Sequence, residues 1–592
     1  MRPRAAFLTT MLACCVLSAA AARGASLSSS APGSATRTVE ARLQAAPGDA
    51  LLEHTEAEYR AAYFYALSCL AGLGGDPADR SLLLQRAQEA DPDSRLLMEE
   101  SAEASLELGK PDAAAGQLRH AVALNPGDLD LRRKLSRVYR ETGRIAEARA
   151  LFLKPDGSDP DDPEWLRCLV GLDFEQGDFA SAERRLRALL QQGGGVDDRE
   201  LLGLTLQRRQ RWPEAAAEYR KVVALDPSRS SSWGRLADCE ESQGDTTSAR
   251  ADLLSGLKAD PGSPLLDDQL GRLLYRTEDF QGAEQAFGRL VERDPTDTHS
   301  LLYRGLSRLK NRRYQEAEAD FTLLGGLQKD DPDQGYALAL AYMMQKKYGQ
   351  AEDQLKKVIK LNGQAEAAWA QLALVYEREK KGPAAVEALR QGLKTLPGSE
   401  ELALLLSAEL EDRNELPAAE EALRDSLKHG GGDEVRFQLA VILDKRGDFP
   451  AAEKELSDLI AESPRHAQAL NYLGYSWADK GVKLDQAEAL IRRALEVDPG
   501  NRYYLDSLGW TLFKAGRAKD ALDPLDQASK GMADSSDADE ALVFEHLAAV
   551  QASLGLQADA DMSKARAQAI RSRSAARPAG DADAPGGGEP GL

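Results

Sequence analysis

Residues that most often carry out chemistry are scarce in this sequence. It has five cysteines and six histidines in 592 residues, and none forms a Cys-x-x-Cys or His-Glu-x-x-His motif, so metal ligation has no support. A Gly-x-Ser-x-Gly motif is also absent, and no glycine-rich loop follows a strand, because no segment has the pattern of one. We therefore predict that the protein is not an enzyme and has no catalytic, cofactor-binding or metal-binding residues.

Positive charge is in deficit. The chain has 96 acidic and 75 basic residues, which gives a net charge of −21. A nucleic-acid binder needs a basic surface that displaces counterions from phosphates. The composition argues against nucleic acid as a partner, although a local basic patch stays open.

Long apolar runs are absent except at the N-terminus. Arg2 and Arg4 precede apolar residues 5–17, and the small residues 20–22 offer a signal-peptidase site. This pattern predicts a secretory signal peptide over residues 1–22 and an exported protein. No other stretch approaches the roughly 20 apolar residues that span a bilayer.

Two cysteines inside the apolar run leave a second interpretation open. Leu12-Ala13, just ahead of Cys14 and Cys15, partly matches a lipoprotein processing box. A lipid anchor at either cysteine would hold the chain at a membrane. The alternative is a mature protein that begins at Arg23 without a lipid.

Alanine and leucine are abundant, and they recur regularly. Thirteen alanines follow one another at steps of 33 to 35 residues; a large apolar residue stands four positions after each, and a small or modest one twelve or thirteen before. Helical spacing puts the alanine and the large residue on one face, and small residues let two helices approach closely. The alanines are Ala114, Ala148, Ala182, Ala215, Ala249, Ala283, Ala317, Ala351, Ala385, Ala419, Ala452, Ala487 and Ala521.

Turn signals agree with this register. Pairs such as Asp226-Pro227 close a repeat, because proline ends one helix and the acidic residue suits the turn before the next. Pairs such as Gly244-Asp245 mark the turn inside a repeat. The sequence therefore predicts tandem helix hairpins.

Leu473-Gly474-Tyr475 and the run Leu-Asp-Ser-Leu-Gly-Trp at 505–510 lie in successive hairpins. This pattern resembles the tetratricopeptide repeat, and the resemblance covers roughly residues 61–533. It implies an all-α fold, a right-handed α-solenoid superhelix of about 14–15 helix hairpins. Stacked repeats of this kind touch only their neighbours, so disulfides between Cys69, Cys168 and Cys239 are not expected, and we interpret all three as buried apolar residues.

The repeat register also divides the chain. Arg80 replaces the expected alanine in the first unit, Pro155 interrupts the third, and Pro524 lies inside a second helix. The predicted segments are a signal peptide (1–22), a Ser/Ala/Gly-rich linker (23–50), an N-terminal capping repeat (51–94), the tandem solenoid (95–533), C-terminal capping helices (534–570) and a disordered tail (571–592).

In the family that the chain resembles, the first helix of each hairpin lines a concave groove that binds an extended peptide or a partner's helix. Projecting that register predicts a partner-binding groove richer in apolar residues than a solvated face needs. For any single residue, packing against the next repeat is an equal alternative. The predicted groove residues are Leu302, Tyr303, Leu306, Tyr336, Leu340, Met343, Met344, Phe437, Val441, Asn471, Tyr472, Tyr475, Tyr503, Asp506, Trp510 and Phe513.

An N-terminal section of the groove is charged instead. Four basic residues on one first helix face four acidic residues on the preceding one, and we favour mutual ion pairing over a site for a partner's carboxylate. The basic residues are Arg133, Lys134, Arg137 and Arg140, and the acidic ones are Glu99, Glu100, Glu103 and Glu107.

The two C-terminal motifs are also similar to those of long exported tetratricopeptide proteins of Gram-negative bacteria. One such group consists of outer-membrane adaptor lipoproteins that bring a carboxyl-terminal processing protease to cell-wall hydrolases. The resemblance implies a scaffold in the periplasm or on the periplasmic face of the outer membrane, whose partners are proteins or peptides, such as an envelope protease and its substrates. The alternative is a structural component of a secretion or envelope-assembly machine, for example for exopolysaccharide export.

Overall fold

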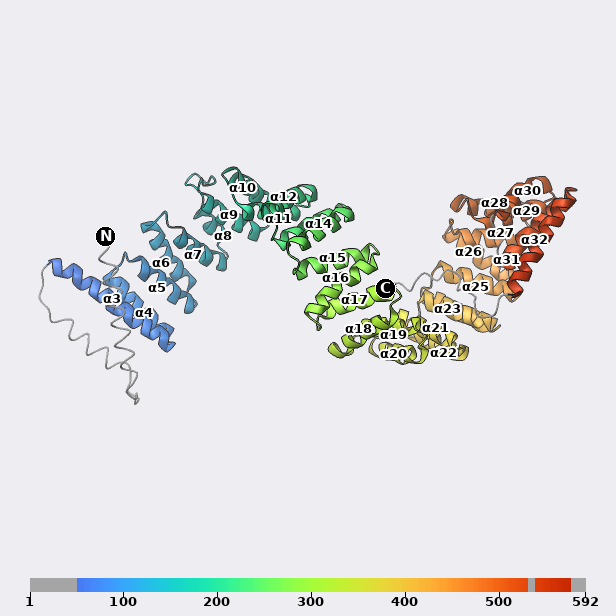
Figure 1. Cartoon of the computed structure of the whole chain (residues 1–592), viewed down its shortest axis with the longest axis horizontal. Helices are drawn as coiled ribbons and strands as arrows, with labels where there is room; N and C mark the ends of the chain where they lie inside the picture. The colour runs from blue at the N-terminus through green and yellow to red at the C-terminus, as the bar shows by residue number, and fades with distance from the viewer. Residues whose placement is uncertain (1–49, 531–537, 577–592) are drawn as a thin grey trace. The chain divides into compact units, whose positions relative to one another are not determined.

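A computed structural model of the chain describes residues 50–530 and 538–576 (Figure 1). Within these ranges the regular elements are α-helices and no strand occurs, which confirms the predicted all-α fold. The predicted signal peptide with Cys14 and Cys15, the linker up to residue 49, residues 531–537 and residues 577–592 lie outside the described ranges.

The chain divides into two units between Thr277 and Glu278. The helices of the first unit are α3 (Ala50–Gly74), α4 (Pro77–Ala90), α5 (Arg95–Glu107), α6 (Pro111–Leu124), α7 (Leu129–Glu141), α8 (Ile145–Ala150), α9 (Pro163–Gln176), α10 (Phe179–Gln191), α11 (Val196–Arg208), α12 (Trp212–Leu225), α13 (Ser230–Glu241), α14 (Thr246–Ala259) and α15 (Pro264–Arg276). Those of the second are α16 (Phe280–Arg293), α17 (Thr298–Lys310), α18 (Tyr314–Leu327), α19 (Pro332–Met344), α20 (Tyr348–Leu361), α21 (Glu366–Arg378), α22 (Gly382–Thr395), α23 (Glu400–Asp412), α24 (Leu416–Lys428), α25 (Asp433–Lys445), α26 (Phe449–Glu462), α27 (Ala467–Asp479), α28 (Leu484–Val497), α29 (Arg502–Lys514), α30 (Ala518–Ser529), α31 (Ala538–Ser553) and α32 (Gln557–Ala576). Consecutive helices within each unit pack against one another.

The alanine register is confirmed. All thirteen alanines are 0% exposed, and the large apolar residues four positions later are at most 3% exposed. Each alanine other than Ala283 marks the crossing of the two helices of a hairpin within one unit, where only a small side chain fits. Each large residue fills the space beside that crossing.

Two glycines show how close these crossings are. A Cβ atom on Gly305 would lie 2.5 Å from Cε1 of Phe321, and one on Gly509 would lie 2.4 Å from Cγ of Leu525 and 3.1 Å from the carbonyl oxygen of Ala521. Real Cβ atoms do not approach other atoms this closely. Glycine at these positions therefore permits the observed helix packing.

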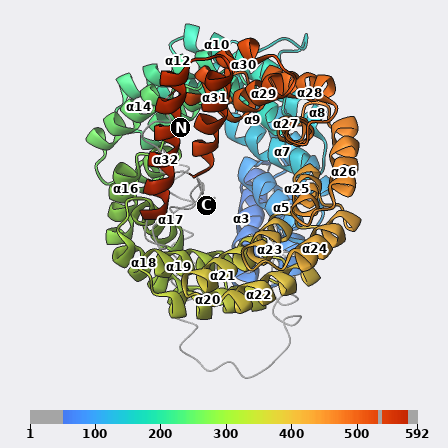
Figure 2. The same ribbon diagram turned by 90° about the vertical axis from the view of Figure 1, so that its right-hand side faces the viewer.

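The hairpins form two layers. Figure 2 shows that from α17 to α28 the odd-numbered helices lie on the inner side and the even-numbered helices on the outer side. The first helix of each hairpin is thus the inner one, as in the register used to predict the groove residues.

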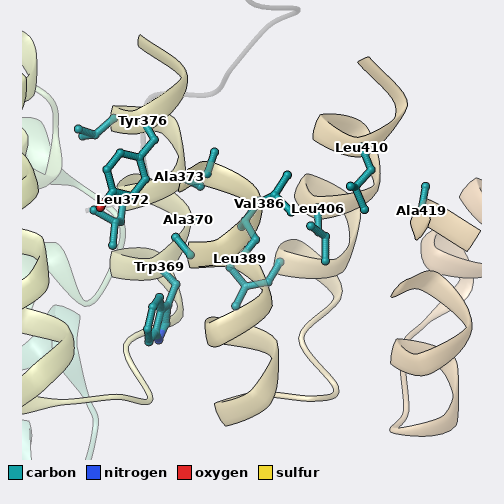
Figure 3. Close-up of a cluster of buried hydrophobic side chains, with 14 of the residues drawn as sticks. Trp369, Ala370, Leu372, Ala373, Tyr376, Val386, Leu389, Leu406, Leu410 and Ala419 are labelled. Atoms are coloured by element: carbon teal, nitrogen blue, oxygen red, sulfur yellow. The ribbon is translucent and has the colours of Figure 1, made fainter. Parts of the chain in front are cut away.

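The core runs between the layers, and Figure 3 shows one section of it. Ala370 and Ala373 of α21 face Val386 and Leu389 of α22, and the cluster continues through Leu406 of α23. Burying each large side chain contributes about 1.5–3 kcal/mol.

The turn inside each described hairpin contains a residue in the left-handed region, and the turn before α28 contains two, Gly481 and Lys483. Gly143, Gly177 and Gly244 take this conformation, as their glycine pairs predicted, with φ of +75°, +68° and +80°. Other hairpins place a non-glycine residue there at a cost in backbone energy. Six such residues have φ between 57° and 61°: Gln210, Glu278, Arg312, Lys346, Lys380 and Asn414.

The irregular positions have local explanations. Arg80 forms ion pairs with Glu100 at 2.7 Å and with Glu107 at 2.6 Å, so this charged replacement for alanine is compensated. Helix α8 is only six residues long and ends before Pro155. Pro524 lies inside α30 with its side chain buried.

The last helix is longer than the sequence indicated. Helix α32 continues to Ala576, so residues 571–576 are helical and not part of the predicted tail. An ion pair of 2.8 Å between Arg571 and Glu545 of α31 holds this extension on the preceding helix.

Two further observations concern membranes and thiols. No helix in residues 50–530 or 538–576 is both long and apolar enough to cross a membrane. The three cysteines of these ranges are free; Cys239 is buried and Cys168 half-buried, but Cys69 is exposed, so the prediction of buried cysteines is wrong for Cys69.

Candidate protein-binding surface

All sixteen predicted groove residues lie on first helices of hairpins. They form two groups, the α17–α19 patch (the seven from Leu302 to Met344) and the α25–α29 patch (the nine from Phe437 to Phe513). Met344 and Tyr503 are the most open, at 51% and 48% exposed, whereas Leu340 and Asp506 are buried at 3% and 6%. The other twelve are half-buried. Most of the sixteen side chains are therefore only partly exposed.

The α17–α19 patch is partly committed to packing. The ring of Tyr303 stacks on Phe287 with centroids 5.3 Å apart and lies 4.8 Å from the ring of His299. Tyr336 and Met343 pack against the buried clusters on either side. Tyr336 and Met343 thus contribute to the core and remain partly exposed.

The α25–α29 patch contains an aromatic array. Phe437 meets Tyr472 edge-on at 5.8 Å, and the hydroxyl of Tyr472 donates a hydrogen bond of 3.1 Å to Asp444. Burial, together with the nearby carboxylates of Asp479 and Asp506, raises the pKa of Tyr475 to about 12. The tyrosines are therefore uncharged near neutral pH, and the array is apolar.

His546 of α31, which the sequence analysis did not single out, closes this array. Its Nδ1 lies 3.0 Å from Oδ1 of Asp506, and its ring stacks on Trp510 with centroids 4.0 Å apart. Asp506 is therefore already occupied by a residue of this chain. The sequence contained a signal for the helix pair α31 and α32. Ala560 is fully buried and follows Ala521 after 39 residues, a longer step than the usual 33 to 35.

Two buried polar atoms in this patch lack partners within the described residues. They are Oδ1 of Asn471, an acceptor, and Nε1 of Trp510, a donor. Buried polar groups are nearly always hydrogen-bonded, so such atoms call for an explanation. An acceptor and a donor together match the two groups of a peptide bond.

The charged section near the N-terminus is a set of ion pairs. Lys134 pairs with Glu99, as predicted. The prediction was wrong for Arg133 and Arg140, which pair with carboxylates of the following helix α9, at 3.1 Å between Arg133 Nη2 and Glu164 Oε2. The charged side chains of Arg133, Lys134 and Arg140 therefore form ion pairs with neighbouring helices of the same chain.

Helices α21 and α23, between the two patches, were passed over in the sequence analysis. Their inner faces carry half-buried Leu404 and Leu405 and the carboxylates Glu377, Glu401 and Glu409. Among the described residues, no group of three or more His, Cys, Asp or Glu side chains is arranged to hold a metal ion.

Curated relatives match parts of the chain. "TPR repeat-containing protein PA4667" of Pseudomonas aeruginosa is 40% identical over 70 residues, 12% of each protein. "Cellulose synthase 1 operon protein C" of Komagataeibacter xylinus is 30% identical over 173 residues, 27% of this chain and 13% of the relative. "Lipoprotein NlpI homolog" of Haemophilus influenzae is 31% identical over 121 residues, 20% of this chain and 38% of the relative. The chain thus spans well under half the length of these relatives.

Solved structures resemble it at low identity. YrrB, described as a TPR protein with an unusual peptide-binding site, is 19% identical with a TM-score of 0.29, over 31% of this chain and 95% of that one. The structure of Naa15/Naa10 bound to HypK-THB is 14% identical with a TM-score of 0.32, over 88% of this chain and 90% of that one.

Family profiles cover most of the repeat region. Two profiles, both described as "Tetratricopeptide repeat", match the chain, one at 105–169 and the other at 200–264, 269–331, 336–400, 437–481 and 483–538. Together with the paired helices, these matches show that the chain belongs to the tetratricopeptide repeat family, whose repeats serve as protein–protein interaction scaffolds.

Proposed function

We propose that this protein is a non-catalytic scaffold of the bacterial cell envelope that holds protein or peptide partners along its inner helix faces. One observation carries the proposal: Leu302, Tyr336 and Phe437 occupy equivalent positions on first helices, and each leaves apolar surface partly open. Open apolar surface on one face of a soluble fold marks interaction sites. We propose both patches as contact regions, with their most exposed members, Met344 and Tyr503, at the contact.

The envelope location is supported by the N-terminal sequence and by a relative. The signal pattern of residues 1–22 favours export, and one relative is a lipoprotein homolog. An envelope protease and its substrates are the partners that the motif resemblance suggests. A lipid on Cys14 or Cys15 would attach the chain to a membrane.

Affinity capture tests the scaffold role. We expect purified protein to retain a defined set of envelope proteins from solubilised membranes of its host, and Met344→Asp with Tyr503→Asp to lose them. Leu323→Asp is the matched control, because Leu323 is similarly exposed, at 45%, on the outer helix α18. Equal loss in the control, or unchanged capture by the double variant, would remove the inner face from the proposal.

The second candidate, a structural part of an exopolysaccharide secretion machine, is favoured by the similarity to cellulose synthase operon protein C. Capture separates the two roles. Secretion subunits of the inner and outer membranes would support the machine, and a protease with its substrates would support the adaptor. The mass of the mature N-terminus tells a lipidated cysteine from a free Arg23.

A further inference from the structure

We propose that the inner faces of α19, α21 and α23 bind a partner segment that combines apolar residues with lysine or arginine. This inference rests on the proposed scaffold function and states which kind of segment the surface takes. We call the surface the acidic inner face. It consists of the apolar residues Tyr336, Met343, Leu404 and Leu405 and the carboxylates Glu366, Glu377, Glu401 and Glu409.

The apolar residues form the floor of this surface. Tyr336, Met343, Leu404 and Leu405 pack with one side against the buried cluster that runs from α19 to α26 and remain partly exposed on the other. This is the continuation of the α17–α19 patch toward α25. A partner's leucine or valine side chains would complete the burial of these four.

The carboxylates flank the floor in two pairs. Glu366 and Glu401 stand at the first turns of α21 and α23, and Glu377 and Glu409 at the last turns of the same helices. Along α21, the eleven residues from Glu366 to Glu377 correspond to about 16 Å at the helical rise. Negative charge therefore borders the floor at both ends of the helices.

These four carboxylates lack a cationic partner within the described parts of the chain. None of them forms an ion pair, whereas other seams of the molecule pair their carboxylates, as Asp320 does with Arg304 at 2.5 Å and Arg308 at 2.7 Å. The cation nearest to Glu409, Arg413, has its own ion pair of 2.9 Å with Glu415. The acidic inner face thus carries negative charge that this chain neutralises only in part, through the nearby charges of Arg378 at Glu377 and Arg413 at Glu409.

The electrostatics agree with a missing cation. Burial raises the pKa of Glu401, and the carboxylate of Glu366 raises it further. Burial likewise raises the pKa of Glu377 and of Glu409, and Asp412 adds to the effect at both. The charges of Arg378 at Glu377 and of Arg413 at Glu409 oppose this shift but do not cancel it. The side chain of Glu401 is nevertheless exposed, which means that surrounding helices desolvate it while leaving access to it.

Binding of a basic segment would oppose the rise in the pKa values of these carboxylates. An ammonium or guanidinium group beside Glu401 or Glu409 would stabilise the charged carboxylate and lower its pKa, so binding would release protons. Affinity should therefore rise between about pH 5 and pH 7 and then level off. Acidic peptides and anionic phosphates would be repelled by the same charges.

A designed peptide pair tests the inference. The probe is a fluorescein-labelled heptapeptide with lysine at both ends and leucine and alanine between, which spans about 20 Å when extended; its partner has glutamate at both ends. We expect the full-length protein to bind the lysine peptide in preference. Glu401→Gln with Glu409→Gln, which keeps side-chain shape, should weaken that binding at least tenfold, as expected for loss of charge-assisted contacts.

The control carries the same change on outer helices. Glu387→Gln in α22 with Glu421→Gln in α24, both exposed, should leave the affinity unchanged. Equal binding of both peptides, no binding of the lysine peptide, or an unaffected inner double variant would overturn the inference. If envelope capture still depends on Met344 and Tyr503 in that event, the scaffold function stands without it.

Discussion

At the crossing of two helices, the difference between hydrogen and methyl decides whether a hairpin closes. Gly305 faces Phe321 and Gly509 faces Leu525 at distances that no Cβ atom tolerates. The sequence predicted this, because a small residue twelve positions before each alanine has a readable volume. The sequence could not predict that Glu401 belongs to the acidic inner face. A glutamate on an inner face cannot be told from one on an outer helix, such as Glu387, without the structure.

Gly305→Ala tests the closeness of the crossing. The added methyl must displace Phe321, so we expect a loss of about 1–3 kcal/mol in the free energy of unfolding. Gly288→Ala in α16 is the control, since nothing lies within 4 Å of its Cβ position; it should gain about 0.5–1 kcal/mol from reduced backbone freedom. Urea unfolding followed by circular dichroism measures both. Equal effects of the two changes would contradict the tight crossing.

At the scale of the helix hairpin, the sequence located the elements well but not all of their turns. The alanine register and the Asp-Pro pairs marked hairpins throughout, because packing volume and helix termination are local properties. Left-handed turn residues were predictable only where glycine occupies them. At Lys346 or Lys380 the conformation is imposed by the packing of both helices, which a propensity for the turn residue does not reveal.

Lys380→Gly relieves this strain. Because a left-handed conformation costs non-glycine residues about 1–2 kcal/mol, partly offset by the greater freedom of glycine in the unfolded chain, we expect a gain of about 0.5–1 kcal/mol. Arg390→Gly, at an exposed site inside α22, should instead lose about 1 kcal/mol. The shift in the urea midpoint measures each. A loss at Lys380 as large as that at Arg390 would show that the turn is unstrained.

For the whole molecule, two features were beyond the sequence analysis. The division between Thr277 and Glu278 has no counterpart in the repeat spacing, since Ala249 and Ala283 on either side are separated by the usual 34 residues. The inner surface of the second unit was predicted as two apolar patches, but the helices between them are acidic. Charge on an inner face depends on how successive repeats stack, which only the assembled structure shows.

A paired carboxylate of the first unit and an unpaired one of the second predict opposite pH responses of stability. In the first unit, the hydrogen bond from Arg167 and that from the Gly195 N–H lower the pKa of Asp198. Its contribution is present above the unfolded pKa of about 3.9 and is lost as pH falls through the lower folded value. Asp198→Asn should therefore cost about 1–3 kcal/mol at pH 7 and progressively less as pH falls below the unfolded pKa.

In the second unit the sign reverses at Glu401, whose pKa burial raises. Its contribution is present below the unfolded pKa of about 4.3 and is lost as pH rises through the higher folded value. Glu401→Gln should match the wild type near pH 4 and be more stable at pH 7, as judged by urea unfolding at both pH values. A loss of stability at pH 7 would mean that this carboxylate already has a cationic partner in the free protein, and the basic-segment inference would lose its electrostatic basis.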